Sequence, residues 1–352
     1  MADGYNGGPY KPILMDGVWE AQQRNLAAGA LLGLLGIGLI YFNGQLILST
    51  VAMLPRLFLA ELGDDTLDDM GKFMRQFKSE IRIAIVVSQY ALMLAPTIWF
   101  VRRFHTSDVK RYVRLNRGRL HHSILAVVST LLIIPLGNYM AGKLSSRMDL
   151  PDEISEMGVS LFVAESPLEF IFLIFVIAVT PAICEEVFFR GYVQRTLERV
   201  AGWKSVIIVG ILFGLFHLQP IGLAATAIMG LLFGYFYFRS RSIIPAIMAH
   251  FANNALVVSL LYFRPVVGGV DLGATDVIPG LWVAITLPAG LAVLGLYHFV
   301  TRQKPQEVLL AVEESAAVPP DKSESTPFGN SDVIGVSSPD KEMPGDESTY
   351  TH

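Results

Sequence analysis

Residues 168–189 read LEFIFLIFVIAVTPAICEEVFF, and this stretch decides the fold. A helix needs about 20 mostly apolar residues to cross the hydrocarbon core of a bilayer, which is about 30 Å thick. Residues 170–184 contain no charged side chain. Because lipid offers no hydrogen-bond partner to the backbone, we expect this stretch to form a transmembrane helix with two glutamates near its end.

Similar apolar stretches recur along the chain, although the one at 205–218 is short. We therefore predict an all-α fold, a polytopic membrane helix bundle of about eight transmembrane helices. The expected spans cover residues 26–54, 81–101, 123–141, 168–189, 205–218, 221–238, 243–262 and 280–300.

The composition agrees with this fold. Of 352 residues, 52% are hydrophobic and 16% are charged, whereas a soluble protein carries about 25% charged residues. This excludes an ordinary water-soluble enzyme and a disordered or fibrous chain. The net charge of −4 is uneven: residues 301–352 hold 4 basic and 10 acidic side chains, and residues 1–300 hold 23 and 21. No basic block indicates contact with nucleic acid.

These differences divide the chain into three parts. Residues 1–24 form a polar N-terminal segment, and residues 25–302 form the transmembrane helical domain. Residues 303–352 are rich in Ser, Pro, Asp and Glu, so we expect a disordered acidic tail.

Basic residues in short loops predict the orientation, because they concentrate on the cytoplasmic side. The connection 102–119 holds seven lysines and arginines. With eight spans, the expected loop 190–204 and the basic residues at 239–241 and 302–304 lie on the same side. The loop 55–80, which mixes both charge signs, conflicts with this assignment. We expect an integral protein of a bacterial inner or plasma membrane with both termini cytoplasmic.

Ionisable side chains inside a span are costly and are therefore functional candidates. Arg190 follows Glu186 by one helical turn, which favours an ion pair. Glu185 points about 100° away and can stay free, and a partly desolvated glutamate suits general-base catalysis. A structural Glu–Arg pair at a helix end explains this segment equally well.

Two further spans contain polar groups. Phe213 and His217 are one turn apart, and His250 and Asn254 share a helical face. Imidazole and carboxamide groups can stabilise an oxyanion, but they also serve as polar contacts between helices. Glu185, His217 and His250 match zinc-site chemistry as well, although the sequence lacks the motif H-E-x-x-H.

In their order and on membrane helices, three motifs resemble the CPBP family, the CAAX protease and bacteriocin-processing (Abi) family of intramembrane endopeptidases. This family includes the type 2 CAAX prenyl endopeptidases, which the eight-span count also fits. The resemblance covers roughly residues 165–260, the protease-like core. The motifs are Glu185-Glu186-x-x-x-Arg190, Phe213-x-x-x-His217 and His250-x-x-x-Asn254.

The resemblance implies peptide-bond hydrolysis in a water-filled cavity inside the membrane that opens to the cytosol. Glu185 would activate the water with the help of His217, and His250 and Asn254 would stabilise the oxyanion. The Glu186–Arg190 pair would orient the site, with Phe213 in support.

The metal question stays open at this point. The family has been described as metalloproteases, with zinc at Glu185, His217 and His250, and a metal-free glutamate mechanism without any cofactor is the alternative. We lean to the metal-free mechanism. Asn254 beside His250 has an evident oxyanion use, and no local carboxylate–His pair suggests a second shell around a metal.

The expected partners are the lipid bilayer and a membrane-associated peptide or lipidated protein substrate. Two other classes stay open: a polytopic transporter or channel with an intramembrane Glu/His path, and a non-catalytic membrane scaffold of the same fold. The absence of a clear internal repeat with paired broken helices weakens the transporter.

The candidate residues can form one site only if they lie at a similar depth in the membrane. Glu185 and His250 are expected roughly 10 Å inside the cytosolic ends of their helices, and His217 roughly 20 Å deep. A tilted fifth helix, or a cytosolic extension of the fourth or fifth helix, would bring the three residues to one level.

Overall fold

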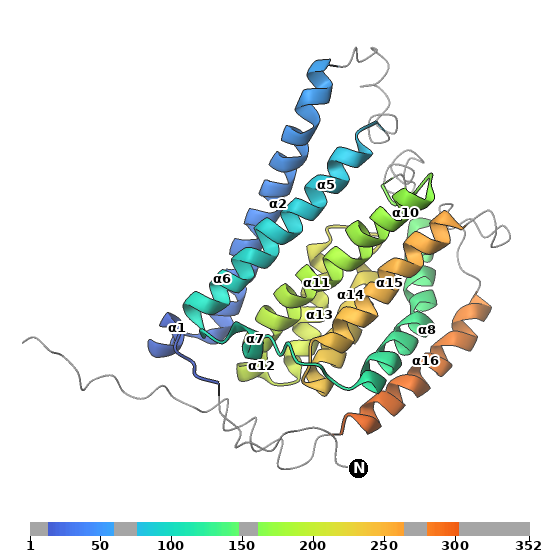
Figure 1. The fold of residues 1–352 in the computed structure, drawn as a ribbon. Coiled ribbons are helices and arrows are strands. Elements are labelled where there is room, and N and C mark those ends of the chain that lie inside the picture. The colour runs from blue at the N-terminus through green and yellow to red at the C-terminus, as the bar shows by residue number, and fades with distance from the viewer. Residues whose placement is uncertain (1–12, 60–75, 148–160, 264–279, 303–352) are drawn as a thin grey trace, which may run out of the picture. The chain divides into compact units, whose positions relative to one another are not determined.

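A computed structural model describes residues 13–59, 76–147, 161–263 and 280–302, and all of them belong to one structural unit. Within these ranges the chain is almost entirely helical and contains no strand (Figure 1). The predicted all-α bundle is therefore confirmed. The expected acidic tail at 303–352 lies outside the described residues.

The described helices follow one another with short connections. In chain order they are α1 (Val18–Ala21), α2 (Leu26–Leu59), α5 (Lys78–Ser88), η1 (Gln89–Leu94), α6 (Ala95–Phe104), α7 (Val109–Tyr112), α8 (Leu120–Ser145), α10 (Pro167–Leu173), η2 (Ile174–Val179), α11 (Thr180–Glu186), η3 (Val187–Gln194), α12 (Arg195–Ala201), α13 (Lys204–Phe216), α14 (Leu223–Ser240), α15 (Ile244–Tyr262) and α16 (Gly280–Val300).

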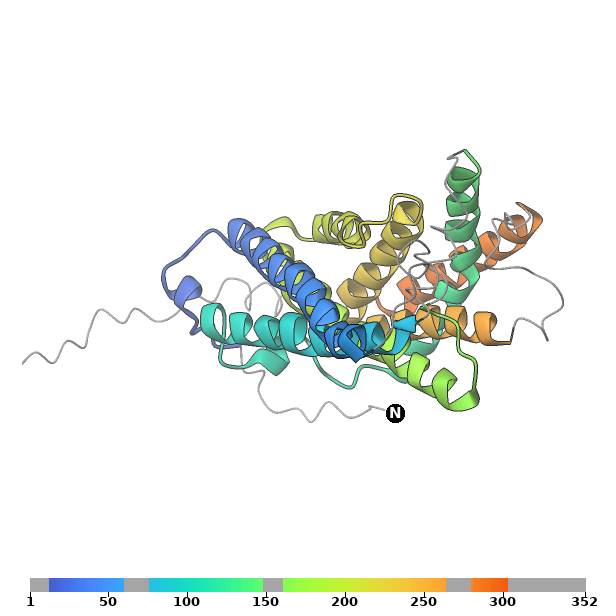
Figure 2. The same cartoon turned by 90° about the horizontal axis from the view of Figure 1, so that it is seen from above.

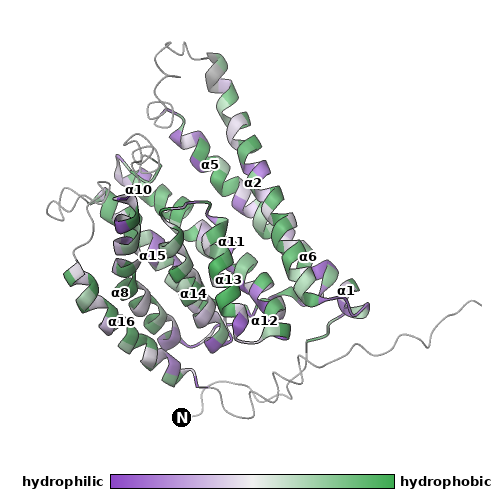
Figure 3. Cartoon of the chain, turned by 180° about the vertical axis from the view of Figure 1, so that it is seen from behind, coloured by the Kyte–Doolittle hydropathy of each residue, from purple (hydrophilic) through white to green (hydrophobic). Residues whose placement is uncertain are grey.

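Within the part of the chain that the structure describes, seven helical segments are long and apolar enough to cross a membrane. They are α2, α5 to α6, α8, α10 to α12, α14, α15 and α16. Apolar residues dominate the middle of these helices (Figure 3), and many large apolar side chains are exposed on them. Exposed apolar surface of this extent fits contact with lipid rather than with water.

The fifth expected span, at 205–218, is shorter than a full crossing. Helix α13 has 13 residues, about 20 Å at 1.5 Å per residue, which is less than the bilayer core. It ends at Phe216 because Leu218 takes a left-handed conformation, with φ of 53°, and Pro220 cannot continue the helix. α13 packs against α14, so the two helices form a hairpin.

The fourth span is longer than predicted. We expected a loop from residue 190, but the helix continues from Pro167 to Ala201, over 35 residues. Glu185 lies 16 residues before Ala201, and His217 lies 13 residues after Lys204, on the other side of a short turn. At 1.5 Å per residue, the two side chains are about 24 and 20 Å from this turn. The extended fourth helix therefore brings His217 to the level of Glu185.

Two of the spanning helices contain a π-helical turn just before a proline. The π-helical segments η1 and η2 each end two residues before a proline, Pro96 and Pro181 respectively. Proline has no N–H, and its ring clashes with the carbonyl four residues earlier. In both helices the preceding turn is widened, a feature that is frequent at functional sites.

The helices that contain the candidate residues lie between two outer groups of helices, although α13 also exposes Ile207, Ile211 and Leu215. α11, α13, α14 and α15 are placed between α2 with α5 to α6 on one side and α8 with α16 on the other (Figures 1 and 2). α13 and α14 approach closely because Gly210 and Gly230 face each other. A Cβ atom on Gly230 would lie 2.5 Å from the carbonyl oxygen of Gly210.

The basic connections meet at one end of the bundle, here called the basic end and formed by residues 105–119, 198–204 and 239–243. There the carboxylate of Glu198 in α12 accepts hydrogen bonds from Arg114 and Arg241. These contacts bring together the loops that the sequence placed on one side of the membrane.

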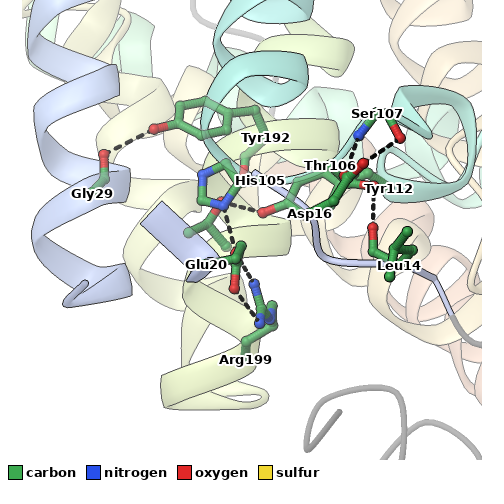
Figure 4. A network of polar contacts seen from close by, with 11 residues as sticks. Leu14, Asp16, Glu20, Gly29, His105, Thr106, Ser107, Tyr112, Tyr192 and Arg199 are labelled. Carbon is green, nitrogen blue, oxygen red and sulfur yellow. Dashed lines mark hydrogen bonds and ion pairs between the residues drawn. The ribbon is translucent and has the colours of Figure 1, made fainter. Parts of the chain in front are cut away.

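The N-terminal residues also pack at the basic end (Figure 4). Glu20 in α1 accepts two hydrogen bonds from Arg199 and lies 2.7 Å from Nδ1 of His105. Asp16 accepts hydrogen bonds from the backbone and hydroxyl of Ser107. Burial opposes the charge of Glu20, but the bonds from His105 and Arg199 outweigh it and hold its pKa below the ordinary value.

Candidate active site

Glu186 is the centre of a buried ion pair. Its Oε1 atom accepts a hydrogen bond from Nη1 of Arg190 at 2.8 Å, and neither side chain has any exposed surface. Nδ1 of His250, from α15, lies 2.8 Å from the same oxygen. The i, i+4 pair predicted from the sequence is therefore present, and it includes a histidine 64 residues away.

Arg190 is held by more than this carboxylate. Its Nη2 donates to the carbonyl oxygen of Gly230 at 2.9 Å, and its guanidinium lies 4.4 Å from the ring centre of Phe213 and 5.5 Å from that of Phe233. A desolvated cation over an aromatic face is stabilised by the ring quadrupole. Arg190 thus links α14 and α13 to the helix that bears the glutamates.

Glu185 has a different environment from its neighbour. Its Oε1 accepts a hydrogen bond from Nε2 of Gln89 at 3.0 Å, and the same Nε2 lies 3.3 Å from the hydroxyl of Tyr41. Its Oε2 is buried and has no hydrogen-bond partner among the described residues. One glutamate is thus paired with a cation, as the direction of the two side chains allowed, whereas the other, which was expected to stay free, accepts a hydrogen bond from a neutral amide.

His250 is fixed by aromatic rings as well as by Glu186. Its ring stacks on Phe233, with centres 4.9 Å apart and planes 18° apart, and meets Phe213 edge-on at 5.8 Å. Because Glu186 takes Nδ1, the remaining ring nitrogen for a substrate contact is Nε2. Nδ1 donates to the carboxylate, so Nε2 can also donate only when the ring carries both protons.

Asn254, one turn after His250, supplies a hydrogen bond to a carbonyl group that a proline cannot serve. Its Nδ2 donates to the carbonyl oxygen of Ile177 at 2.8 Å, and its Oδ1 accepts from Asn253. Pro181, four residues after Ile177, has no N–H for that carbonyl. An amide nitrogen has two N–H groups, so one is still available for an oxyanion.

His217 follows the last residue of α13. Its Nδ1 lies 2.7 Å from the carbonyl oxygen of Phe213, which can only accept, so Nδ1 is the protonated nitrogen. Nε2 is then an acceptor. The ring also packs on Phe213, with centres 4.7 Å apart.

The predicted site residues therefore meet in one region of the bundle. Phe213 lies at its centre, with ring or cation contacts to Arg190, His217 and His250. Glu185 joins this group through its neighbour in α11, and no direct contact between Glu185 and His217 is seen among the described residues.

The three residues that the sequence offered as zinc ligands are not arranged as a zinc site. Within the ranges that the structure describes, no three His, Cys, Asp or Glu side chains lie close enough together to hold one metal ion. Glu185, His217 and His250 all belong to these ranges, so the geometry supports no zinc site between them. The carboxylate–His contact that we did not find in the sequence does exist, between Glu186 and His250.

Sequence reasoning missed three residues of the site: Gln89, Tyr41 and Phe233. A signal existed for the first of them, because Gln89 is an uncharged polar residue within an apolar span, and such groups in lipid need a partner. Phe233 is one of many aromatic residues in the spans, and nothing in the local sequence distinguishes it.

Comparison with known proteins identifies the segment that contains this site. Residues 167–256 match the family model described as type II CAAX prenyl endopeptidase Rce1-like. No curated protein and no solved structure matches the chain. The matched segment begins with α10 and includes each of the three motifs, which confirms the resemblance to the CPBP endopeptidases.

Proposed function

We propose that this Rce1-like membrane protein is an intramembrane endopeptidase in which Glu185 activates the attacking water. The observation that carries the proposal is the contrast between the two adjacent glutamates. Glu186 accepts a hydrogen bond from the Arg190 cation and lies against His250, whereas the only hydrogen bond to Glu185 from the described residues comes from the neutral amide of Gln89. The second oxygen of each carboxylate is buried without a hydrogen-bond partner among these residues, so the difference lies in the charge of the donor. A carboxylate that stays charged and unpaired is the one suited to accept a proton.

The proposed reaction is hydrolysis of a peptide bond. Glu185 takes one proton from water, and the oxygen of that water forms a bond to the carbonyl carbon of the substrate. Nε2 of His217 accepts the hydrogen bond of the second water proton. When the C–N bond breaks, Glu185 returns its proton to the leaving nitrogen, so that the products are a carboxylic acid and an amine.

The tetrahedral intermediate carries a negative charge on the former carbonyl oxygen. Nε2–H of a charged His250 and the second N–H of Asn254 are the donors for this oxygen. Glu186 stabilises the charge of His250, and Arg190 balances the charge of Glu186. No step of this mechanism passes through a metal ion.

The position of the site suggests where the substrate binds. We propose that residues 25–302 form the catalytic unit with both termini cytoplasmic, and that the basic end faces the cytosol. Glu185 then lies about 24 Å from the turn after Ala201, within the membrane-spanning part of the bundle. A substrate at this depth is a membrane-associated peptide or a lipidated protein.

Cleavage of a quenched peptide library by the purified protein in detergent tests the proposal. We expect cleavage by the wild type and by Glu165→Gln, a matched substitution at an exposed position of the same polypeptide segment, and none by Glu185→Gln. Equal cleavage by Glu185→Gln and the wild type would refute the role of Glu185. No cleavage by the wild type, together with proton-coupled flux in liposomes, would favour a transporter instead.

The same cleavage assay with a zinc chelator tests whether the reaction needs a metal ion. Because the described side chains form no group of three that could hold a metal ion, we expect a strong zinc chelator to leave the cleavage rate unchanged. Loss of cleavage that added zinc restores would overturn this part of the mechanism.

A further inference from the structure

Gln89 is a buried amide in the middle of an apolar helix. It lies at the first residue of η1, and its side chain is 2% exposed. Its Nε2 donates to Oε1 of Glu185 at 3.0 Å and lies 3.3 Å from the hydroxyl of Tyr41. The contact therefore joins three helices that are distant in the sequence: α2, η1 and α11.

The position is costly for a purely structural residue. The Oε1 atom of Gln89 is buried and has no hydrogen-bond partner among the described residues. Leaving a buried polar atom unsatisfied costs about 1–3 kcal/mol. An apolar side chain would avoid this cost in a membrane helix, so the retained amide points to a role at the carboxylate that it contacts.

The chemistry of the donor matters as much as its position. Arg190 holds Glu186 with a full positive charge and a hydrogen bond of 2.8 Å. Gln89 holds Glu185 with a neutral N–H, which fixes the direction of the carboxylate, and no cation is hydrogen-bonded to Glu185 among the described residues. With Oε1 occupied by Gln89, Oε2 is the oxygen that can accept a proton from water.

Tyr41 contacts the amide directly and also interacts with the charge of the Glu185 carboxylate. Its ring stacks on Phe216, with centres 6.1 Å apart, and this fixes the hydroxyl that meets Nε2 of Gln89. Phe216 is the last residue of α13, directly before His217. The contact between Tyr41 and Phe216 thus connects Gln89 to the end of α13, where His217 lies.

We propose that Gln89 is a positioning residue that aims Oε2 of Glu185 at the attacking water, and that Tyr41 holds Gln89 in place. This inference rests on the proposed role of Glu185 as the base. A positioning error of about 1 Å at a reacting group can reduce turnover by about 100-fold. Removal of the amide is therefore expected to lower kcat and to leave KM nearly unchanged.

The test compares Gln89→Leu, Tyr41→Phe and Ser88→Ala with the wild type in the peptide-cleavage assay. Ser88 is the control for packing against α2, because it is buried on the same turn and donates to Gln45 of α2, 2.7 Å away. It also interacts with Tyr41, but no contact with Glu185 is seen among the described residues. We expect a fall in kcat of about 10- to 100-fold for Gln89→Leu with KM within about twofold. Tyr41→Phe should show a smaller fall in kcat, and Ser88→Ala should show no larger fall than Tyr41→Phe.

A second readout does not depend on turnover. The carboxylate stretching band of Glu185 is isolated by the infrared difference between the wild type and Glu185→Gln. Gln89→Leu should shift this band because it removes a hydrogen bond from the carboxylate, and Ser88→Ala should leave it in place.

The outcomes separate the two hypotheses. If the wild type cleaves peptides and Gln89→Leu has an unchanged kcat or an unshifted band, the positioning role is refuted while the proposed function stands. Equal losses of kcat in Gln89→Leu and Ser88→Ala would show that packing against α2 is responsible, and would also refute it. If the wild type cleaves nothing, the proposed function fails and the positioning role fails with it.

Discussion

Glu186→Gln removes one negative charge from a site where the positive partner is completely buried. Arg190 would then keep the carbonyl oxygen of Gly230 and the face of Phe213, but no carboxylate. Removing one partner of a buried ion pair costs about 3–5 kcal/mol, because the other charge stays desolvated and unpaired. The retained contacts to Arg190 favour the lower part of this range, so we expect a loss of about 3 kcal/mol.

The neighbouring substitution is an internal control. Glu185→Gln makes the same chemical change one residue earlier, but no cation is hydrogen-bonded to Glu185 among the described residues, Arg190 keeps its direct ion pair with Glu186, and a glutamine can still accept from Gln89. The expected loss is below about 1 kcal/mol, the net value of an ordinary hydrogen bond. Both variants should lose activity, because Glu185 is the proposed base and Glu186 orients His250. Only Glu186→Gln should lose substantial stability.

Unfolding titrations in mixed micelles with increasing sodium dodecyl sulfate measure the difference. The double variant Glu186→Gln, Arg190→Met supplies a further control, since it removes the unpaired cation and should recover most of the lost stability. Equal stability losses for Glu185→Gln and Glu186→Gln would refute the contrast between the two carboxylates. A double variant less stable than Glu186→Gln alone would refute the unpaired cation as the cause.

Two further predictions concern the frame around the site. The pKa of Glu20 is lowered in the folded protein, so its contribution to stability is complete above the ordinary value of 4.5 and is lost as the pH falls through the lower folded value. Glu20→Gln should therefore lower the thermal midpoint at pH 7 by more than at pH 3, and an equal drop at both would contradict this. Gly230→Ala places a Cβ atom 2.5 Å from the carbonyl oxygen of Gly210 and should destabilise the protein, by about 1–3 kcal/mol for overpacking. Gly36→Ala, which meets nothing within 4 Å, should change thermal stability little, and comparable losses in both glycine variants would show that the close approach is not the cause.

The fold class was accessible from the sequence because membrane insertion depends on local properties. An apolar run of about 20 residues determines a spanning helix whatever the rest of the chain does, and six of the expected spans correspond to helices of spanning length within a few residues at most boundaries. The fourth was found but ended too early, since its charged second half, from Arg190 onward, resembles a loop when burial is unknown. The short stretch at 205–218 was counted as a span because hydropathy alone does not show where Leu218 and Pro220 end the helix.

The contacts of the site can also be divided into those that follow from one segment of sequence and those that only the fold creates. The i, i+4 pair of Glu186 and Arg190 follows from helical geometry within one segment, and the structure contains it. The contact of His250 with Glu186 joins residues 64 positions apart, and no local pattern specifies which of several polar groups in different spans will meet. The sequence showed a free glutamate beside a paired one, but not the amide that holds the free one.

The sequence by itself determined that this is an α-helical membrane protein, which residues are chemically unusual within the spans, and which family their order resembles. These properties depend on composition, on helical period and on spacing, all of which are local. Only the tertiary structure decided that Phe213 contacts Arg190 and two histidines, that Gln89 contacts Glu185, and that the zinc set left open by the sequence, which lies within the described residues, forms no metal-binding group. Those relations depend on how far each helix extends and how closely the helices pack, at points such as Pro96, Pro181 and the contact between Gly210 and Gly230.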